Sequence, residues 1–414
     1  MKYLLVIGDG MADNPVPELG GKTPLEAVDT PAIDALARGG MLGSVRTVPK
    51  ELPPGSDTAI LSIFGCDPRR YFTGRSPLEA AGCGVKLEPG CASFRCNMVC
   101  LEDGDKPFGE KKILSHNAGS IDGETSMAII TELCADPEFH AALEAAGMTI
   151  APTPSFRHIA QQRGGDIRGL VATPPHDILG QEIGKYEFSG NENAKVLWNL
   201  MELANKKLEH LPRNEARRAQ GKKPANGIWF WAEGTAVELP SFRGQYGVDG
   251  AVISAVPLCH GIGVLRGLEM VEVPGATGEL DTNFEGKLEA AWEKLNQYDF
   301  VCLHLEAPDE CTHNGDLPGK LQAIEWLDSR LVAPLLSRLE AAGMDHRVLL
   351  LSDHKTLTAT RGHDGDPVPF LLYDSRRNSR RGGVYDEAAG EAGPFLERGC
   401  ELLDLLFEKR ILPE

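Results

Sequence analysis

Short apolar runs that end at glycine or polar residues recur near both ends of the chain. The runs Lys2–Ile7, Tyr298–Leu305 and Val348–Leu351 each predict a buried strand. Helical stretches such as Ala32–Arg38 and the amphipathic Glu285–Leu295 lie between strand-like runs. Strands that alternate with helices predict an α/β fold, with a mostly parallel sheet flanked by helices on both faces.

The pattern changes in the middle of the chain, between residues 79 and 264. Here strand-like pieces, of which Ala251–Ala255 is the last, are mixed with a long polar helix at Asn191–Leu208. We therefore expect an inserted α+β domain over 79–264. It would be set into a domain formed by residues 1–78 and 265–414.

Composition narrows the class of protein. The 414 residues suffice for two domains, and 42% hydrophobic with 25% charged residues is ordinary for a soluble globular protein. A net charge of −18 argues against nucleic acid or an anionic membrane surface as the main partner, although a few local arginines or metal ions would still allow an anionic small substrate. No apolar run is long enough to span a bilayer, and the first one is too short for a signal peptide. The ten scattered cysteines fit reduced thiols, so we expect a cytoplasmic protein.

Carboxylates and imidazoles follow three of the predicted strands. Asp9 comes directly after the first run, and Asp353-His354 comes after Val348–Leu351. Asp309 and His313 follow the strand at Tyr298–Leu305 and are four residues apart, so one helical turn directs both side chains to the same point. His363 lies on the loop after His354. Ligands bind at the carboxyl ends of the strands in an open parallel sheet, so these positions predict one shared site.

A serine stands in a second conspicuous place. The sequence Pro53-Pro54-Gly55 presents Ser56 just before the helix-like run Ala59–Phe64. Ser56 is either a helix N-cap or a nucleophile at a helix end that favours an anion.

Three Asp, three His and one Ser are enough ligands for two divalent ions. Mixed carboxylate and imidazole ligands favour Mn²⁺ or Zn²⁺ and allow Mg²⁺. Two metals about 3.5–4 Å apart would hold the attacking and leaving oxygens of a phosphoryl group. A serine bound to one of them would lose its proton near neutral pH and become a nucleophile.

The order of these residues resembles the alkaline phosphatase superfamily and, within it, the cofactor-independent phosphoglycerate mutases of the archaeal type. The resemblance runs over nearly the whole chain. It includes the segments GDGMAD, YFTGRSPLEAAG, FRCN at Phe94–Asn97 and HGIGVLRGLE at His260–Glu269. It implies an alkaline phosphatase-like core and interconversion of 3-phosphoglycerate and 2-phosphoglycerate without 2,3-bisphosphoglycerate.

The resemblance also implies roles for individual residues. Ser56 would accept the phosphoryl group and later return it to the other hydroxyl of the trapped glycerate, with the two domains closed to exclude water. One metal would be bound by Asp309, His313 and His363, and the other by Asp9, Ser56, Asp353 and His354.

The inserted domain would hold the glycerate part of a small phosphorylated substrate. Arginine suits a carboxylate or phosphate because it forms bidentate hydrogen bonds. The candidate substrate residues, each of which could equally be a surface residue, are Arg95, Asn97, Arg157, His158, His176 and Asp177. Whether the protein is a monomer or a homo-oligomer stays open.

Two departures from the family pattern keep other activities open. After Ile113–Ser115 the chain reads His116 and then Asn117-Ala118-Gly119-Ser120, where a Ser-Ala-Gly-His run is usual. Lys355 stands where a serine commonly follows the Asp-His pair. The alternatives are a homoserine kinase-like phosphoryl transferase, a phosphomonoesterase, and a non-catalytic binding module with a structural metal.

Overall fold

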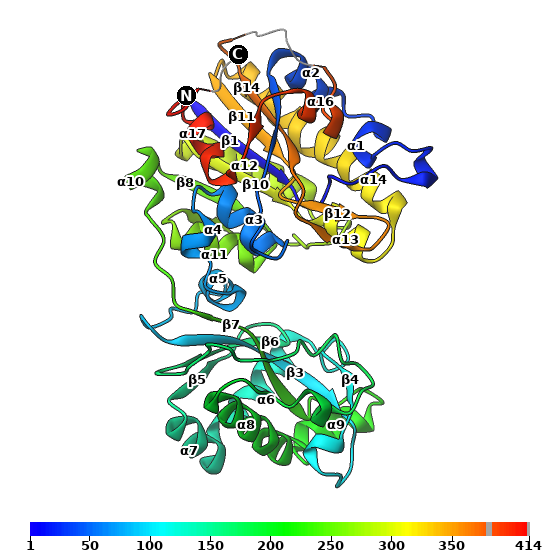
Figure 1. The fold of residues 1–414 in the computed structure, drawn as a ribbon, viewed down its shortest axis with the longest axis vertical. Helices are drawn as coiled ribbons and strands as arrows, with labels where there is room; N and C mark the ends of the chain where they lie inside the picture. The colour runs from blue at the N-terminus through cyan, green and yellow to red at the C-terminus, as the bar shows by residue number, and fades with distance from the viewer. Residues whose placement is uncertain (378–382, 412–414) are drawn as a thin grey trace. The chain divides into compact units, whose positions relative to one another are not determined.

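The computed structural model describes residues 1–377 and 383–411. The chain divides into two compact units, coloured by residue number in Figure 1. The first unit combines Met1–Phe72 with Glu238–Glu414, and the second is the continuous segment Thr73–Val237. We call them the discontinuous unit and the inserted unit.

The discontinuous unit is built on an eight-stranded sheet with the order β15-β2-β14-β11-β1-β10-β8-β9. At its centre β1 (Lys2–Gly8) pairs in parallel with both β10 (Phe300–Leu305) and β11 (His346–Leu351). Every residue of β10 and β11 is buried. A strand covered on both faces needs apolar residues on both, which is why these strands appear as continuous apolar runs in the sequence.

The outer strands complete a sheet that is mostly but not entirely parallel. On one side β8 (Gly250–Ile253) and β9 (Glu269–Val271) extend the parallel part. On the other side β14 (Val368–Asp374) is antiparallel to β11 and to β2 (Met41–Val45), which pairs in parallel with the short β15 (Phe395–Leu396).

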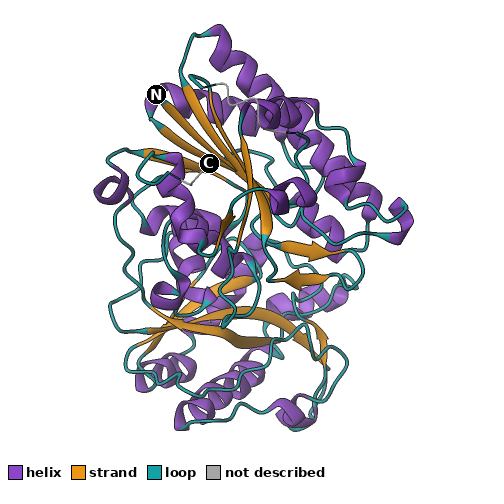
Figure 2. Ribbon diagram, turned by 45° about the horizontal axis from the view of Figure 1, so that its top comes forward, coloured by secondary structure: helices purple, strands orange, loops and turns teal. Residues whose placement is uncertain are grey.

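Helices cover both faces of this sheet, as Figure 2 shows. One layer contains α2 (Pro31–Gly39), α12 (Phe284–Gln297) and α15 (Ala333–Ala341). Another contains α3 (Ser56–Ile63) and α11 (Pro257–Leu265). The predicted α/β class, with a mostly parallel sheet flanked by helices, is therefore confirmed.

The inserted unit has an antiparallel sheet of five strands. The central β3 (Ala92–Leu101) pairs with β6 (Arg157–Gln162), β7 (Gly227–Thr235) and the short β4 (Ile113–Ser115), and β5 (Met148–Ala151) pairs with β6. The helices of this unit are α5 (Arg75–Gly82), α6 (Gly123–Ala135), α7 (Pro137–Ala145), α8 (Glu192–Leu208) and α9 (Pro212–Ala219). Trp198 and Trp229 pack edge to face in the core between α8 and β7.

The predicted boundaries of the insert need correction. The insert begins at Thr73 rather than residue 79 and ends at Val237 rather than residue 264. The strand predicted at Ala251–Ala255 is β8, which pairs in parallel with β10 and so belongs to the main sheet. An isolated strand-like run does not reveal which sheet it joins, because its partner is distant in the sequence.

None of the helices in the described ranges is long and apolar enough to cross a lipid bilayer.

Candidate metal centre

Polar side chains gather at the carboxyl ends of the three central parallel strands. Asp9 follows β1, Asp353 follows β11, and the short helix α13 (Ala307–His313) follows β10 and carries Asp309. These strands are adjacent and parallel, so their carboxyl ends lie at one edge of the sheet. Asp9 and Asp353 are fully buried and Asp309 is 4% exposed.

The first ligand group consists of Asp309, His313 and His363. Nε2 of His313 lies 3.1 Å from Asp309 Oδ2 and 2.9 Å from Nε2 of His363. Nε2 of His363 lies 3.4 Å from Asp309 Oδ1. Nδ1 of His313 is 2.8 Å from the carbonyl oxygen of Arg361, to which it donates a hydrogen bond that orients the ring. Two imidazole nitrogens and a carboxylate that converge in this way match the ligands of a divalent metal.

The second ligand group surrounds His354, which is fully buried. Its Nε2 lies 3.2 Å from Ser56 Oγ, 3.2 Å from Asp353 Oδ2 and 3.7 Å from Asp9 Oδ1. The two groups adjoin, because ligand atoms of Asp9, Asp309 and His354 all lie within 4.8 Å of one another. The seven residues singled out in the sequence therefore form one cluster.

Local structure explains how the chain delivers these side chains. Ser56 is the first residue of α3, after Gly55, and is 6% exposed. Pro308 occupies the first turn of α13, where its missing N–H costs nothing, and Asp309 and His313 lie one helical turn apart. Thr356 Oγ1 donates to Asp309 Oδ1 at 2.6 Å and lies 3.2 Å from Nδ1 of His354, so it links the two groups.

Burial and mutual repulsion make this cluster costly without a cation. Burial, together with the neighbouring Asp353 and Glu306 carboxyls, raises the pKa of Asp9 well above its usual range. Burial also acts to raise the pKa of Asp309, but hydrogen bonds from His313 and His363 outweigh it and hold this pKa well below its usual range. The hydrogen bond to Asp309 raises the pKa of His313 to about 9.

Two buried carboxylate oxygens, Asp9 Oδ1 and Asp353 Oδ2, have no hydrogen-bond partner among the described residues. A buried carboxylate oxygen without a donor needs a positive charge nearby. The donor set therefore fits divalent cations, with carboxylate and imidazole ligands of the kind that Mn²⁺ and Zn²⁺ accept.

Two further polar residues at this edge were not predicted from the sequence. His304, within β10, is fully buried, and its Nε2 lies 3.0 Å from Asp9 Oδ2. Burial lowers the pKa of His304 to about 3, and burial with repulsion from Asp309 raises the pKa of Glu306 to about 8. The sequence does not single out His304, because it stands inside the apolar run FVCLHL. A histidine in such a buried strand is the one signal that could have revealed it.

The candidate substrate residues of the inserted unit are only partly brought together. The Arg95 guanidinium lies 4.5 Å from the ring centre of Trp231, and the His176 ring lies 5.1 Å from it. His116, also not predicted, lies 6.0 Å from His176. Arg157 lies beside the ring of Phe156, which in turn contacts His116. This group of aromatic and cationic side chains is the part of the unit that could hold an anion.

Other candidates in this unit have hydrogen-bond or ion-pair partners within the unit, and their contact with a substrate stays a prediction. His158 is fully buried; its Nδ1 accepts from the Thr153 N–H at 3.1 Å, and its Nε2 lies 3.1 Å from Ser126 Oγ. The Asn97 amide accepts from Trp231 Nε1 at 2.9 Å and donates to the His116 carbonyl oxygen at 3.0 Å.

Arg95 forms a buried ion pair with Glu79 on α5. Asp177 is exposed and its nearest charged neighbour is His176, at 3.6 Å.

The two departures from the family pattern lie in segments with defined local contacts. Lys355 Nζ donates to Asn14 Oδ1 at 2.9 Å, and Lys355 begins the hairpin strand β12 (Lys355–Leu357), which pairs with β13 (Gly362–Asp364), the strand of His363. The Asn117–Ser120 stretch forms a turn, in which Asn117 Oδ1 accepts from the Ser120 N–H at 3.0 Å. Ala118 and Ser120 have positive φ values of 49° and 54° in this turn.

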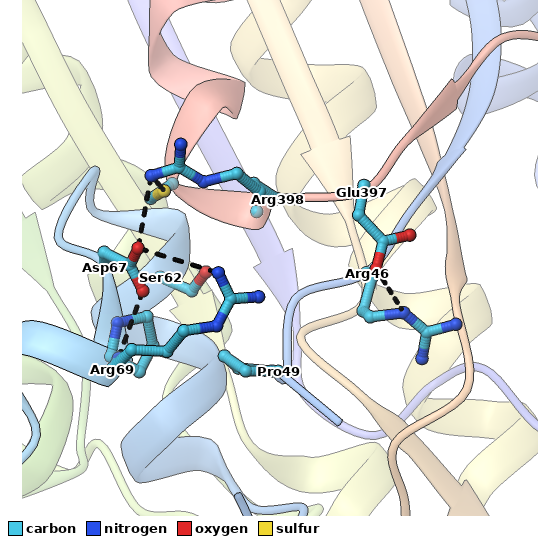
Figure 3. A pocket seen from close by; sticks show the side chains of 10 residues that line it. Arg46, Pro49, Ser62, Asp67, Arg69, Glu397 and Arg398 are labelled. Carbon is cyan, nitrogen blue, oxygen red and sulfur yellow. Dashed lines mark hydrogen bonds and ion pairs between the residues drawn. The ribbon is translucent and has the colours of Figure 1, made fainter. Parts of the chain in front are cut away.

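A separate small cavity in the discontinuous unit does not belong to the metal cluster (Figure 3). Arg46, Arg69 and Arg398 line it, but each faces a carboxylate. Arg398 pairs with Asp67 at 3.1 Å, and Arg46 with Glu397 at 3.5 Å. Its cations are thus already neutralised, and it contains none of the predicted site residues.

Comparison with known proteins points to one family. A family model described as 2,3-bisphosphoglycerate-independent phosphoglycerate mutase matches residues 37–214. An enzyme of that name from Methanothrix thermoacetophila is 44% identical over 407 residues, which cover 98% of this chain and 99% of the relative. One from Methanosarcina acetivorans is 42% identical over 409 residues, covering 98% and 99%.

Solved structures agree on the fold. A Pyrococcus horikoshii protein has a TM-score of 0.78 at 30% identity, with 100% of this chain and 99% of that one covered. A cofactor-independent phosphoglycerate mutase from Thermoplasma acidophilum has a TM-score of 0.63 at 24% identity, with 99% and 100% covered.

Proposed function

The chain belongs to the family of 2,3-bisphosphoglycerate-independent phosphoglycerate mutases, and on that premise we propose that it interconverts 3-phosphoglycerate and 2-phosphoglycerate through a phosphoserine at Ser56. The observation that carries the proposal is the position of Ser56 Oγ, 3.2 Å from His354 Nε2 and within the carboxylate and histidine cluster. A purely structural metal site seldom includes a serine ligand.

We assign two divalent ions to this cluster, with Mn²⁺ or Zn²⁺ favoured by the mixed ligands. Asp309, His313 and His363 would hold one, and Asp9, Ser56, Asp353 and His354 the other. Bound ions would neutralise the charge of the phosphoryl group and lower the proton affinity of the serine hydroxyl.

The chain's own residues then define the steps. The Ser56 hydroxyl gives up its proton as Oγ attacks phosphorus, the bond from phosphorus to the substrate oxygen breaks, and that oxygen of the released glycerate takes up a proton. In the return step the other hydroxyl of the same glycerate loses its proton and attacks the phosphoserine, the bond from phosphorus to Ser56 Oγ breaks, and Ser56 regains a proton. Atoms and charge balance without any second phosphorylated cofactor, which accounts for independence from 2,3-bisphosphoglycerate. We assign the retention of glycerate to the inserted unit, with Arg157 and His176 as its strongest candidates.

The test is the reaction itself. Protein supplied with Mn²⁺ should convert 3-phosphoglycerate to 2-phosphoglycerate with no 2,3-bisphosphoglycerate present, and mass spectrometry of quenched protein should find phosphate on Ser56. Ser56→Ala should lower kcat by at least about 10³-fold, because the nucleophile is lost. The matched control is Ser62→Ala, since Ser62 is a buried serine on the same helix.

Other products would overturn the proposal. Formation of O-phosphohomoserine from homoserine, or of free phosphate alone, would assign a different reaction to the same cluster. Full activity of Ser56→Ala would remove the phosphoserine step.

We also propose a cytoplasmic location. All ten cysteines are free thiols in the described structure, which suits a reducing compartment.

A further inference from the structure

A second set of polar side chains contacts Asp9, and none of its members belongs to the seven predicted ligands. His304 Nε2 lies 3.0 Å from Asp9 Oδ2, and His304 Nδ1 lies 3.0 Å from Ser254 Oγ, just after β8. The buried Lys287, on α12, donates from Nζ to the His304 carbonyl oxygen at 3.0 Å. His304 is thus held on both sides of its ring and at its backbone.

The hydrogen bonds of Ser254 fix which nitrogen of His304 carries the proton. Ser254 Oγ accepts from the Val256 N–H at 3.0 Å, and within the described residues its own hydrogen has His304 Nδ1 as its acceptor. A neutral imidazole carries one N–H, so the hydrogen lies on Nε2. When Asp9 is ionised to bind a cation, this assignment also avoids a bare ring nitrogen 3.0 Å from a carboxylate oxygen, which would be repelled.

The consequence concerns the two oxygens of Asp9. Oδ2 accepts the His304 N–H, whereas Oδ1 is buried without a hydrogen-bond partner in the described structure and lies 3.7 Å from His354 Nε2. A carboxylate held by one oxygen presents the other in a defined direction.

We propose that His304 is a positioning residue for the reaction: its Nε2–H, fixed by Ser254, holds Asp9 so that Oδ1 is the oxygen offered to a divalent cation. The inference rests on the proposed function for the identity of the second ligand group. It adds a layer, Ser254 to His304 to Asp9, that the ligand set does not contain. Because β8, β10 and β1 are consecutive strands of the sheet, this layer runs along their carboxyl ends.

The same atoms could instead hold a third cation. Ligand atoms of Asp9, His304 and Glu306 lie within 4.8 Å of one another, and Glu306 Oε2 is buried without a hydrogen-bond partner in the described part of the chain. The hydrogen-bond pattern favours positioning, because an Nε2 that carries hydrogen has no lone pair for a metal. The number of bound ions distinguishes the two readings.

The experiment measures binding of Mn²⁺ alone to the metal-depleted full chain by isothermal titration calorimetry, with metal content after dialysis as a second readout. The variants are His304→Ala, which removes the donor, and His304→Gln, whose amide N–H reaches the position of Nε2. Ser254→Ala keeps the His304 imidazole but removes the hydroxyl that fixes its tautomer. The matched control is His346→Ala, since His346 is also buried but begins β11, at the end of the strand opposite Asp353.

We expect two Mn²⁺ per parent chain. His304→Ala should weaken one of them by about 10–100-fold, the range for loss of a residue that orients a metal ligand, and leave the other unchanged. His304→Gln should recover most of that affinity. Ser254→Ala should show a smaller loss of affinity, and this variant still tests the inference if His304→Ala does not fold.

Three results would overturn the inference. The first is parental Mn²⁺ affinity in both His304→Ala and Ser254→Ala. The second is an equal loss in His346→Ala, which would make the effect one of general stability. The third is three ions in the parent and two in both His304→Ala and Glu306→Gln, which would make His304 a ligand of a third cation. Since the readout is Mn²⁺ binding rather than turnover, a failed mutase assay would leave this test intact.

Discussion

The metal cluster of the discontinuous unit and the buried Arg95 and His158 of the inserted unit differ in whether their polar atoms have hydrogen-bond partners. In the discontinuous unit, Asp9, Asp353 and His354 are fully buried, and two of their carboxylate oxygens lack a hydrogen-bond partner among the described residues. In the inserted unit, Arg95 and His158 are buried with polar partners of their own. The first arrangement leaves bonding capacity for a ligand, whereas the second uses it to hold the fold together. Burial of a charged residue is therefore no guide to function until its partners are counted.

Removing a ligand from the metal cluster should give the largest difference in effect between substitutions in the two units. His363→Ala should weaken one Mn²⁺ by more than about 100-fold, a greater loss than that expected for a residue outside the ligand set. His158→Ala, in the inserted unit, should lower thermal stability and leave Mn²⁺ binding unchanged. Calorimetric Mn²⁺ titration and thermal melts of both variants measure the contrast. If His363→Ala retained both ions with parental affinity, the contrast between the two units would be contradicted.

Breaking the buried ion pair of the inserted unit should lower the free energy of unfolding rather than change the reaction. Arg95→Met leaves the Glu79 carboxylate buried without its main partner, so the free energy of unfolding should fall by about 3–5 kcal/mol. Arg163→Met is the matched control, because Arg163 pairs with Glu88 on the surface of the same unit, and should cost at most about 1 kcal/mol. Denaturant melts provide the measurement. Equal losses in the two variants would contradict the structural role of Arg95.

The same pair predicts a dependence on acid. Burial would raise the pKa of Glu79, but Arg95 and Arg75 lower it to about 2, below the value of 4.5 for the free side chain. A carboxyl with a lowered pKa contributes stability that is complete above about pH 4.5 and is lost as the pH falls toward 2. The difference in melting temperature between the parent and Glu79→Gln should therefore shrink from pH 6 to pH 3. A constant difference would mean that the pair does not set the pKa.

The smallest effect should come from Asp177. Its side chain is exposed and contacts only His176 among charged neighbours in the described structure. Asp177→Asn should leave kcat/KM for 3-phosphoglycerate within about twofold of the parent, as for most surface substitutions. A tenfold rise in KM would instead place Asp177 in the substrate site.

The metal cluster was open to prediction because of where its residues stand relative to strands. Asp9 and Asp353 each follow an apolar run, and the carboxyl ends of adjacent parallel strands meet whatever the intervening sequence. The spacing of Asp309 and His313 needs only one helical turn. These features are local, so the sequence alone could indicate a common site.

The buried contacts of the inserted unit are harder to predict from the sequence, for a physical reason. Every residue of β3 is buried, so the alternation that normally separates the two faces of a strand is missing. Its pairing with β7 also shifts register between Ser93 and Arg95. Without the register, the buried partners of Arg95 and Asn97 could not be inferred. The role of His304 could not be predicted for a similar reason, since its partner Asp9 lies 295 positions away in the chain.

The place of β1 at the centre of the sheet has a consequence for synthesis on the ribosome. Tyr3 in β1 pairs with Phe300 on one side and with Arg347 on the other. β1 thus lacks both of its strand partners until β10 and β11 have been translated. The inserted unit, being continuous, can complete its own sheet in the meantime. We expect ribosome-bound nascent chains in which the inserted unit is folded and β1 is still unpaired. A chaperone that binds unpaired strands during translation should therefore bind β1.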